Sequence, residues 1–589
     1  MSTPSTASVA VPEKPAMSHR QVLEALSGLL LGMFVSMLAS TVVSSSLPVI
    51  VPDLSGDQAA FTWVVTATLL TTAISTPIWG KLADLFNRKL LFQLAIGIFV
   101  LASATAGFAQ DPGMLIASRA VQGIGAGGLA ALSQVLMADI ISPRERGRYM
   151  GLFGAVMAVA TVGGPLLGGV ITDAWGWRWN FFVALPVAIL ALIIVQRTLH
   201  VAKHEKRKVS IDYTGIVLLS AAVALLLIWI TNAGTTTTAL VDGKTVALDF
   251  WDFGNNDWWS VTTLWMVGGA LLATIVFVIV ELRSKEPLVP LSLFRNLTFT
   301  LSVIASIATG IAMFGASVFL SQYMQLARGA TPTEAGLMTI PMIAGLLISS
   351  VAIGGLITKY GRWKPYLIVG SVFLIAGSYL LSTIHYDTNF VLVSVYMFVL
   401  GAGVGMTMQN LVLVVQNTTK PTEIGVASSG VTFFRSLGGT IGVSVMGAAL
   451  GSRVVDLLAD SKDDITQAIM SLGDKAQYWA DQLSSGALPE VSSMPEALRV
   501  IIEDVYAQGI SHSFLIAVPF AIISLLAIVF LPNKPLTRMT TNERLHAEEA
   551  DLATVSVPEG MQVLTATGSI RTADGADGPD ASPEAPERR

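Results

Sequence analysis

The ten residues GKLADLFNRK (80–89) place four charged side chains between two long apolar runs. A similar pattern, GGLITKYGRWK (354–364), follows 274 positions later. The alignment pairs two glycines and two arginines, Gly80 with Gly354 and Arg88 with Arg362. The glycine-rich fourth and twelfth apolar runs repeat at nearly the same offset, 278 positions. We therefore expect two related bodies of six helices, with the residues between them forming an insert.

Hydrophobic residues make up 53% of the 589 positions and charged residues only 13%, against about 25% charged residues in an ordinary soluble domain. Apolar runs of about 20 residues, long enough for a helix to cross a hydrocarbon layer of about 30 Å, recur along the chain. The composition and these runs indicate an all-α integral membrane protein, which we expect in the plasma membrane, and exclude a soluble fold. The absence of cysteine excludes disulfides, thiolate nucleophiles and cysteine-based metal sites.

Fourteen apolar runs predict fourteen membrane-spanning helices. Their expected ranges are 23–47, 58–80, 90–109, 112–138, 148–173, 178–198, 212–232, 258–282, 298–325, 333–358, 364–384, 390–417, 422–451 and 511–532. We expect an N-terminal six-helix bundle at 21–200, two inserted helices at 201–297 and a C-terminal six-helix bundle at 298–532. Polar tails at 1–20 and 533–589 are predicted to be disordered and cytoplasmic.

Lysine and arginine are distributed unevenly between alternate connections of these helices. Eighteen of them lie in six connections, and only three lie in the short connections between those six. Because cytoplasmic loops are enriched in lysine and arginine, we expect the basic connections and both termini to face the cytoplasm. Two external connections stand out. Residues 235–250 are expected to form a hairpin around Asp242-Gly243, and residues 453–510 form a long loop with helix-like patterning.

Several motifs together resemble those of the major facilitator superfamily, specifically its 14-span drug:proton antiporter branch of the QacA and EmrB type. The resemblance rests on GKLADLFNRK, RAVQGIGAGG (119–128) and GLFGAVMAVATVGGPLLGG (151–169). The last segment is similar to the antiporter motif of the fifth span, with matching positions at Gly151, Gly164, Pro165, Gly168 and Gly169. The resemblance implies an exporter of hydrophobic or amphipathic compounds, a multidrug efflux protein that exchanges them for protons by alternating access.

Two positions depart from the pattern of that branch. Ala160 stands where the antiporter motif usually has a glycine. Ala39 precedes Ser40 and Thr41 where the first span usually has an aspartate. In addition, no Asp or Glu lies in the middle of any predicted span. The sequence therefore does not show which group would carry a proton.

The loop at 80–89 has two possible roles. Asp84 can accept hydrogen bonds from the N-terminus of a neighbouring helix and pair with an arginine, which would latch the two halves together. Alternatively, Arg88 and Lys89 only orient the helices. Orientation requires positive charge but not Asp84, so we expect a latch. The predicted gating residues are Gly80, Asp84, Arg88, Lys89, Gly354 and Arg362.

Arg119 and Arg435 lie inside predicted spans, where an arginine costs about 2.5–3.5 kcal/mol unless it faces a cavity or a partner. The family resemblance implies a role for Arg119 in proton coupling, and the alternative is a side chain that extends to the membrane surface. Arg435 either has a functional role or ties helices together through carbonyl groups. The candidate coupling residues are Arg119, Gln122, Asp139 and Arg435.

Amide and methionine side chains that face between the halves are candidates for lining a substrate pocket, because methionine adapts to varied apolar shapes. These residues are Gln322, Gln325, Met406, Met408 and Asn410. The alternative for methionine in an apolar helix is ordinary packing. The glycines and the proline of the fifth span are expected to allow a close helix contact or a bend.

No nucleotide-binding loop, nucleophile elbow or zinc-protease motif occurs in the sequence. We therefore expect a monomeric transporter rather than an enzyme, with no cofactor, metal site or nucleic-acid partner. Its expected partners are the lipid bilayer, protons and a hydrophobic small molecule or lipid. Two alternatives stay open, namely an exporter of a cell-envelope lipid or lipophilic metabolite, and a membrane sensor or scaffold that transports nothing.

Overall fold

The computed structural model describes residues 19–55, 58–199, 212–232, 238–241, 244–247, 249–252, 255–284, 287–330, 332–473, 477–479, 494–537, 539 and 543–544. Contacts divide the chain into two units, Met1–Asn542 and Glu543–Arg589, and every labelled element lies in the first unit. Most residues of the two predicted tails lie outside the described residues.

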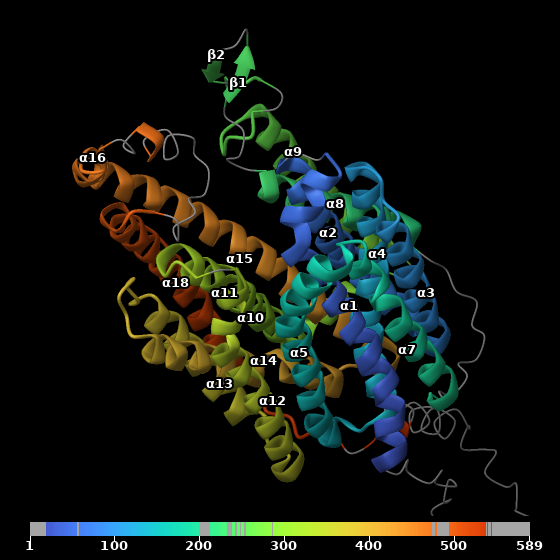
Figure 1. The fold of residues 1–589 in the computed structure, drawn as a ribbon. Coiled ribbons are helices and arrows are strands. Elements are labelled where there is room, and N and C mark those ends of the chain that lie inside the picture. The colour runs from blue at the N-terminus through green and yellow to red at the C-terminus, as the bar shows by residue number, and fades with distance from the viewer. Residues whose placement is uncertain are drawn as a thin grey trace, which may run out of the picture. The chain divides into compact units, whose positions relative to one another are not determined.

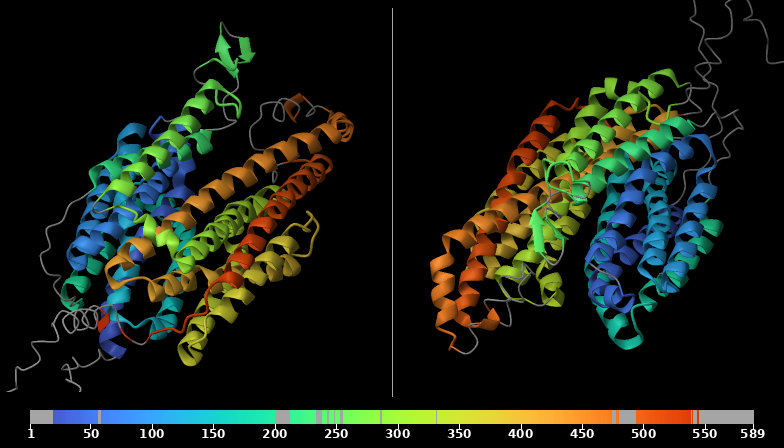
Figure 2. Two further views of the ribbon diagram at one scale, coloured as in Figure 1. Left: turned by 180° about the vertical axis from the view of Figure 1, so that it is seen from behind. Right: turned by 90° about the horizontal axis from the view of Figure 1, so that it is seen from above.

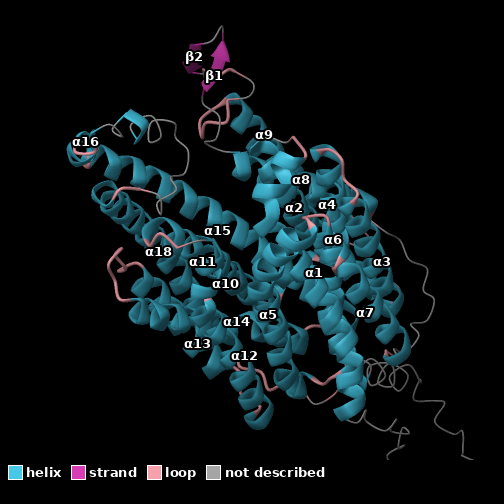
Figure 3. Cartoon of the chain, in the orientation of Figure 1, coloured by secondary structure: helices cyan, strands magenta, loops and turns pink. Residues whose placement is uncertain are grey.

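Helices form nearly all of the described structure (Figure 3). The N-terminal half contains α1 (His19–Asp53), α2 (Gln58–Leu85), α3 (Arg88–Gly107), α4 (Pro112–Ile140), α5 (Pro143–Trp175), α6 (Trp179–Phe182) and α7 (Ala184–Thr198). The insert contains α8 (Tyr213–Asn232), β1 (Thr238–Val241), β2 (Lys244–Ala247) and α9 (Val261–Arg283). The C-terminal half contains η1 (Leu291–Arg295), α10 (Leu297–Gln322), η2 (Tyr323–Ala327), α11 (Pro332–Met338), α12 (Ile340–Tyr360), α13 (Lys364–Leu381), α14 (Phe390–Thr418), η3 (Pro421–Glu423), α15 (Ile424–Asp460), α16 (Lys462–Met470) and α18 (Glu496–Phe530).

Each half has its own hydrophobic core. In the N-terminal half, buried side chains of α1, α3, α4, α5 and α7 form one cluster. In the C-terminal half, α10, α13, α14, α15 and α18 form another. Figure 1 shows the blue and cyan helices of the first half grouped apart from the yellow to red helices of the second. The two predicted six-helix bodies are therefore present.

The halves meet through two equivalent helix pairs. Helix α2, the second of its half, packs on α15, the fifth of the other half. In the same way α12, the second helix of the C-terminal half, packs on α5, the fifth of the N-terminal half. This reciprocal pairing is the arrangement expected of two halves related by an axis along the membrane normal.

The inserted helices α8 and α9 pack on each other and contact both halves. Side chains of α8 and α9 share an apolar cluster with Ala73 of α2 and Phe433 of α15. Beyond them, β1 and β2 pair antiparallel with Val241 opposite Lys244, so a hairpin forms where the sequence predicts one. Figure 2 shows this hairpin at the end of the two helices.

Two helices continue beyond the predicted spans, into the segment 453–510 whose sequence has helix-like patterning. Helix α18 begins at Glu496 rather than at 511, and α15 continues to Asp460 instead of ending at 451. Both extensions carry charged residues, which end an apolar run, yet each keeps an apolar stripe that is buried, as at Leu457 and Leu498. The predicted external loop 453–510 is therefore partly helical. Helices of 35 and 37 residues are about 52 and 55 Å long, well beyond a hydrocarbon core of about 30 Å.

The predicted C-terminal tail starts with an ordered segment. The indole N–H of Trp363 donates to the carbonyl of Lys534 at 2.8 Å, and the Asn417 side chain bonds the backbone at Pro535 and Thr537. Residues 533–537 therefore belong to the C-terminal half and not to a disordered tail.

Twelve helices in the described part of the chain are long and apolar enough to cross a membrane. Helices α2 and α5 are not among these twelve. All fourteen predicted spans coincide with helices or pairs of short helices, whereas fourteen membrane crossings remain a prediction.

Candidate functional site

The carboxylate of Asp84 joins the two halves of the molecule. Asp84 lies in the last turn of α2 and accepts the backbone N–H groups of Gly425 and Val426, each at 2.9 Å. These two residues begin α15, where backbone N–H groups have no partner within the helix. The Asp84 side chain is only 5% exposed. A buried carboxylate at a helix N-terminus makes charge-assisted hydrogen bonds, which are roughly twice as strong as neutral ones.

Arg88 pairs with this carboxylate from the first turn of α3. It donates to Asp84 at 3.3 Å, to the carboxylate of Asp139 on α4, and to the carbonyl of Ala83 at 2.8 Å. The side chains of Arg88 and Asp139 are 1% and 2% exposed. Because one buried arginine serves two buried carboxylates, losing any of the three would leave a buried charge with less compensation. We call Asp84, Arg88, Asp139, Gly425 and Val426 the latch.

Glycine brings α2 and α15 close enough for the latch to form. A methyl group at Gly80 would clash with the Ser429 side chain and would lie 2.8 Å from the carbonyl oxygen of Gly425. A methyl group at Gly425 would lie 2.7 Å from the carboxyl carbon of Asp84. Both helices thus need a residue without a side chain at this crossing.

A second connection between the halves lies beside the latch. The Arg146 guanidinium, on α5, donates to the side-chain oxygen of Gln416 on α14 and to the carbonyls of Ala138 and Ile141. The amide nitrogen of Gln416 donates to the Ser428 hydroxyl at 2.8 Å. The sequence places Arg146 in a basic loop, within the segment PRERGR (143–148) that resembles the antiporter branch, and does not single out Gln416. The signal that could have identified Gln416 is a polar side chain near the end of an apolar helix.

The repeated motif of the C-terminal half has a different residue at the position of the latch carboxylate. Thr358 aligns with Asp84 and donates to the carbonyl of Gly354 on its own helix, and Arg362, which aligns with Arg88, is exposed. Both halves instead share a lysine that bonds the end of the last helix of its own half. Lys89 donates to the Gln196 carbonyl at the end of α7, and Lys364 donates to carbonyls at the end of α18. Of the predicted gating residues, Gly80, Asp84 and Arg88 take part in the described contact between α2 and α15.

Arg119 is buried inside the N-terminal half. Its side chain is hydrogen-bonded to the Gln122 oxygen at 2.6 Å and to the Val64 carbonyl at 3.3 Å, and Gln122 in turn donates to the Ser103 hydroxyl. The residue is 1% exposed, so the side chain does not extend to the membrane surface. Asp139 lies twenty residues further along α4, about 30 Å away along the helix. The four coupling candidates therefore do not form one site.

Arg435 lies in the C-terminal half, 5% exposed, and donates to the carbonyl of Met408 at 3.2 Å. This is the contact that a structural tie between α15 and α14 would make. The methionines of the predicted pocket also pack within this half. Met408 belongs to its hydrophobic core, and a methyl group at Gly370 would lie 2.7 Å from Cβ of Met406. These two methionines are thus in packing positions.

The amide candidates keep unused hydrogen-bonding capacity. Asn410 donates to the Met406 carbonyl at 2.7 Å, and Gln325 donates to the Ser321 hydroxyl at 3.1 Å. The side-chain oxygens of Gln322 and Asn410 are buried without a hydrogen-bond partner among the described residues. A buried amide oxygen without a partner is costly, so both are available to a polar ligand or water.

The antiporter-like segment of α5 packs against α1. The Thr41 hydroxyl donates to the carbonyl of Ala160 at 3.0 Å, and a methyl group at Gly164 would clash with the Thr41 side chain. Ser46 lies 3.4 Å from the carbonyl of Gly168 and accepts from Asn180. Small residues of α5 therefore allow close contact with α1. The predicted positions Gly151, Pro165 and Gly169 lie outside the residues whose side chains are described.

A cavity of about 390 Å³ lies between α2, α4 and α8, a volume within the range of small-molecule sites. Apolar side chains form most of its wall, with three hydroxyl groups. The lining residues are Thr71, Ile74, Ser75, Ile78, Trp79, Leu82, Ile124 and Ser220. None of the predicted pocket residues borders this cavity.

Comparisons with known proteins agree with this architecture. The model of the Major Facilitator Superfamily matches residues 29–443. The chain is 35% identical to the multidrug transporter protein MdtP of Bacillus subtilis over 78% of this chain and 80% of that protein. It is 30% identical to multidrug resistance protein 3 of the same organism over 86% of this chain and 94% of that protein.

Two solved structures are similar in fold. The proton:xylose symporter XylE has a TM-score of 0.55 at 14% identity, covering 90% of this chain and all of that one. The human organic anion transporter MFSD10 has a TM-score of 0.52 at 13% identity, covering 85% of this chain and 99% of that one. At such identities the similarity concerns the fold alone.

Proposed function

The chain belongs to the major facilitator superfamily, a family of membrane transporters, and on that premise we propose that it exports hydrophobic and amphipathic compounds in exchange for protons. Alternating access would expose a site between the halves first to one side of the membrane and then to the other. Relatives named as multidrug transporters support the substrate class. A proton is a sufficient driver, since one charge moving through 100 mV is worth about 2.3 kcal/mol.

The hydrogen bonds that Asp84 accepts from the N-terminus of α15 carry this proposal. They cross from one half to the other at the end of α2. Hydrogen bonds to a charged group at the end of two packed helices can be exchanged for water when the helices separate there. The contact therefore suits a gate that opens and closes. We expect this end to face the cytoplasm, because the adjoining loops are basic.

Dye efflux from inverted membrane vesicles with an imposed pH gradient tests the proposal. Wild-type protein is expected to accumulate dye only when the gradient is present, and Asp84→Asn and Arg119→Ala are expected to reduce that accumulation. Asp111→Asn is a matched control because Asp111 only caps the start of α4, at Met114. Gradient-independent behaviour shared by all four proteins would remove proton antiport.

A second candidate function is export of a cell-envelope lipid. The long helices α15 and α18, which extend far beyond the thickness of a bilayer, favour it together with Ala39 at the position of the usual acid. Replacing residues 462–495 by a short linker separates the candidates. A drug exporter should keep dye transport, while a lipid exporter should lose lipid transport. Protein that moves neither dye nor lipid under any gradient would support a sensor or scaffold.

A further inference from the structure

Two carboxylates meet where the insert packs against α2. Asp212 precedes α8, and Glu281 lies in the last turn of α9, 4% exposed. A methyl group at Gly215 would lie 2.8 Å from Oδ2 of Asp212 and 2.8 Å from Oε1 of Glu281. The two oxygens are therefore at most twice that distance apart.

The two carboxylates differ in how many hydrogen bonds they accept. Asp212 accepts the backbone N–H of Gly215 through Oδ1 at 2.8 Å, which caps α8, while its Oδ2 is buried and has no hydrogen-bond partner among the described residues. Glu281 accepts the backbone N–H groups of Leu288 and Val289 at 3.1 and 3.3 Å. An unpartnered carboxylate oxygen facing a second carboxylate lacks a donor, and a proton between the two would supply one.

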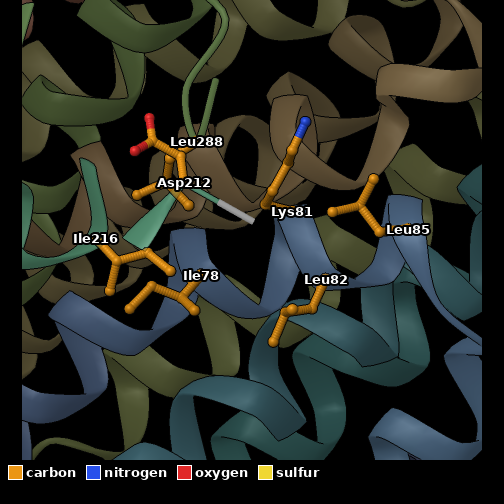
Figure 4. Close-up of a pocket in the computed structure, with 7 residues that line it drawn as sticks. All are labelled: Ile78, Lys81, Leu82, Leu85, Asp212, Ile216 and Leu288. Atoms are coloured by element: carbon orange, nitrogen blue, oxygen red, sulfur yellow. The ribbon is translucent and has the colours of Figure 1, made fainter. Parts of the chain in front are cut away.

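Lys81 connects this pair to the latch. Figure 4 shows Lys81 of α2 and Asp212 lining one small hollow together with Leu288. The hollow has a volume of about 10 Å³, enough for about one water molecule. Lys81 precedes Asp84 by about one turn of α2 and borders the same hollow as Asp212. It is therefore a positive charge located near both the pair and the latch.

We propose that Asp212 and Glu281 form a proton-binding pair in which one proton, taken from water, weakens the attraction to Lys81 and favours release of α2 from α15. Protonation lowers the charge of the pair from two negative charges to one. The attraction between the pair and Lys81 falls accordingly. Conversely, a latch that opens and carries Lys81 away leaves two adjacent carboxylates without their counter-charge, so proton binding and opening favour each other.

The position of the insert links protonation of the pair to movement of the halves. Helix α8 packs on α2 in one half and also on α15 in the other. Because α8 cannot follow both halves when they separate, its contacts with α2 around Asp212 and Glu281 change if α8 stays with α15. Among the described residues, Lys81 on α2 is the charged group that lies beside the pair. A role of the pair in coupling transport to protons depends on the proposed proton antiport. Binding of a proton by Asp212 and Glu281 does not depend on it.

The test measures opening of the latch side as a function of pH without substrate or gradient. The chain has no cysteine, so spin labels attach only at introduced positions. Phe86→Cys and Lys420→Cys are suitable because both residues are exposed and flank the latch from opposite halves. In nanodiscs, acidification should move the distance distribution of the parent protein toward longer values. Glu281→Gln should show the longer distances already at neutral pH and lose the pH-dependent shift.

Asp212→Asn is the second variant in case Glu281→Gln fails to fold, and it should behave alike, since its amide still caps α8. Glu24→Gln is the control, because Glu24 is an exposed partner of Arg20 far from the pair. A pH response of the parent type in both Glu281→Gln and Asp212→Asn would overturn the inference, even if gradient-driven transport is found. A vesicle assay in which the wild type ignores the gradient would instead remove the proposed antiport, and the distance titration would still decide the proton site.

Discussion

Asp84 and Gly425 are in direct contact although 341 residues separate them in the chain: the carboxylate accepts the backbone N–H at 2.9 Å. One residue ends a helix of the N-terminal half, and the other begins a helix of the C-terminal half. The contact uses the strongest acceptor available to a helix N-terminus, and its partners can be exchanged for water without breaking either core. The two halves can therefore separate at this contact without unfolding.

Asp84→Asn should expose the start of α15. The amide keeps the shape of the side chain but removes the charge, and hydrogen bonds to charged groups contribute about 1.5–3 kcal/mol. Hydrogen–deuterium exchange at Gly425 and Val426 should accelerate on the order of ten- to a hundredfold. In Asp111→Asn the amides at the start of α15 should exchange as in wild type. Unchanged protection in Asp84→Asn would show that the side chain does not hold the halves together.

Gly80→Ala should weaken the closed state by steric conflict. The new methyl group meets the Ser429 side chain and the Gly425 backbone, and the backbone cannot move away cheaply. We expect a lower melting temperature in detergent and reduced dye transport. Gly97→Ala is the matched control, because nothing lies within 4 Å of a methyl group there. Equal effects of the two substitutions would contradict the close approach of α2 and α15.

The repeated motif explains what the sequence could and could not predict. It allowed the two halves and the hydrogen-bonding role of Asp84 to be anticipated, because a carboxylate is not needed for orientation. It could not identify Gln416 or Glu281, since a single polar residue at the end of an apolar helix has no pattern of its own. Only the folded chain brings each of them beside a residue that is distant in sequence.

The helix ends show the same limit. Charged residues after 451 and before 511 interrupt the apolar runs, so hydropathy alone does not reveal that both helices continue past the apolar segment. Burial of Leu457 and Leu498 depends on their partners in the fold, which an apolar run does not reveal.

Arg146 and Gln416 should be energetically coupled. A double-mutant cycle with Arg146→Met and Gln416→Leu, read from thermal stability, is expected to give a coupling energy of about 1.5–3 kcal/mol, since the bond is buried and involves a charged donor. The exposed pair Arg20–Glu24 provides the reference and should give about 0.3–0.5 kcal/mol. Coupling no larger than that of the exposed pair would mean that Gln416 does not connect the halves.

Asp53 should not contribute to the pH dependence of transport. Hydrogen bonds from the Trp177 indole and the Arg178 guanidinium hold the pKa of Asp53 below its ordinary value of 3.8. A lowered pKa means that the ionised pair persists at neutral pH and is lost only as the pH falls through that lowered value. Asp53→Asn should therefore leave the pH profile of transport between roughly pH 5 and 8 unchanged. A displaced profile would show that Asp53 is a coupling group.

The distance between spin labels at Phe86→Cys and Lys420→Cys reports whether the two halves separate, because the two positions lie on opposite sides of the Asp84 contact. We expect two populations of distances, with the shorter dominant in the parent protein at neutral pH and the longer dominant after Asp84→Asn. A single distance that neither Asp84→Asn nor added substrate changes would contradict a gate between two moving halves.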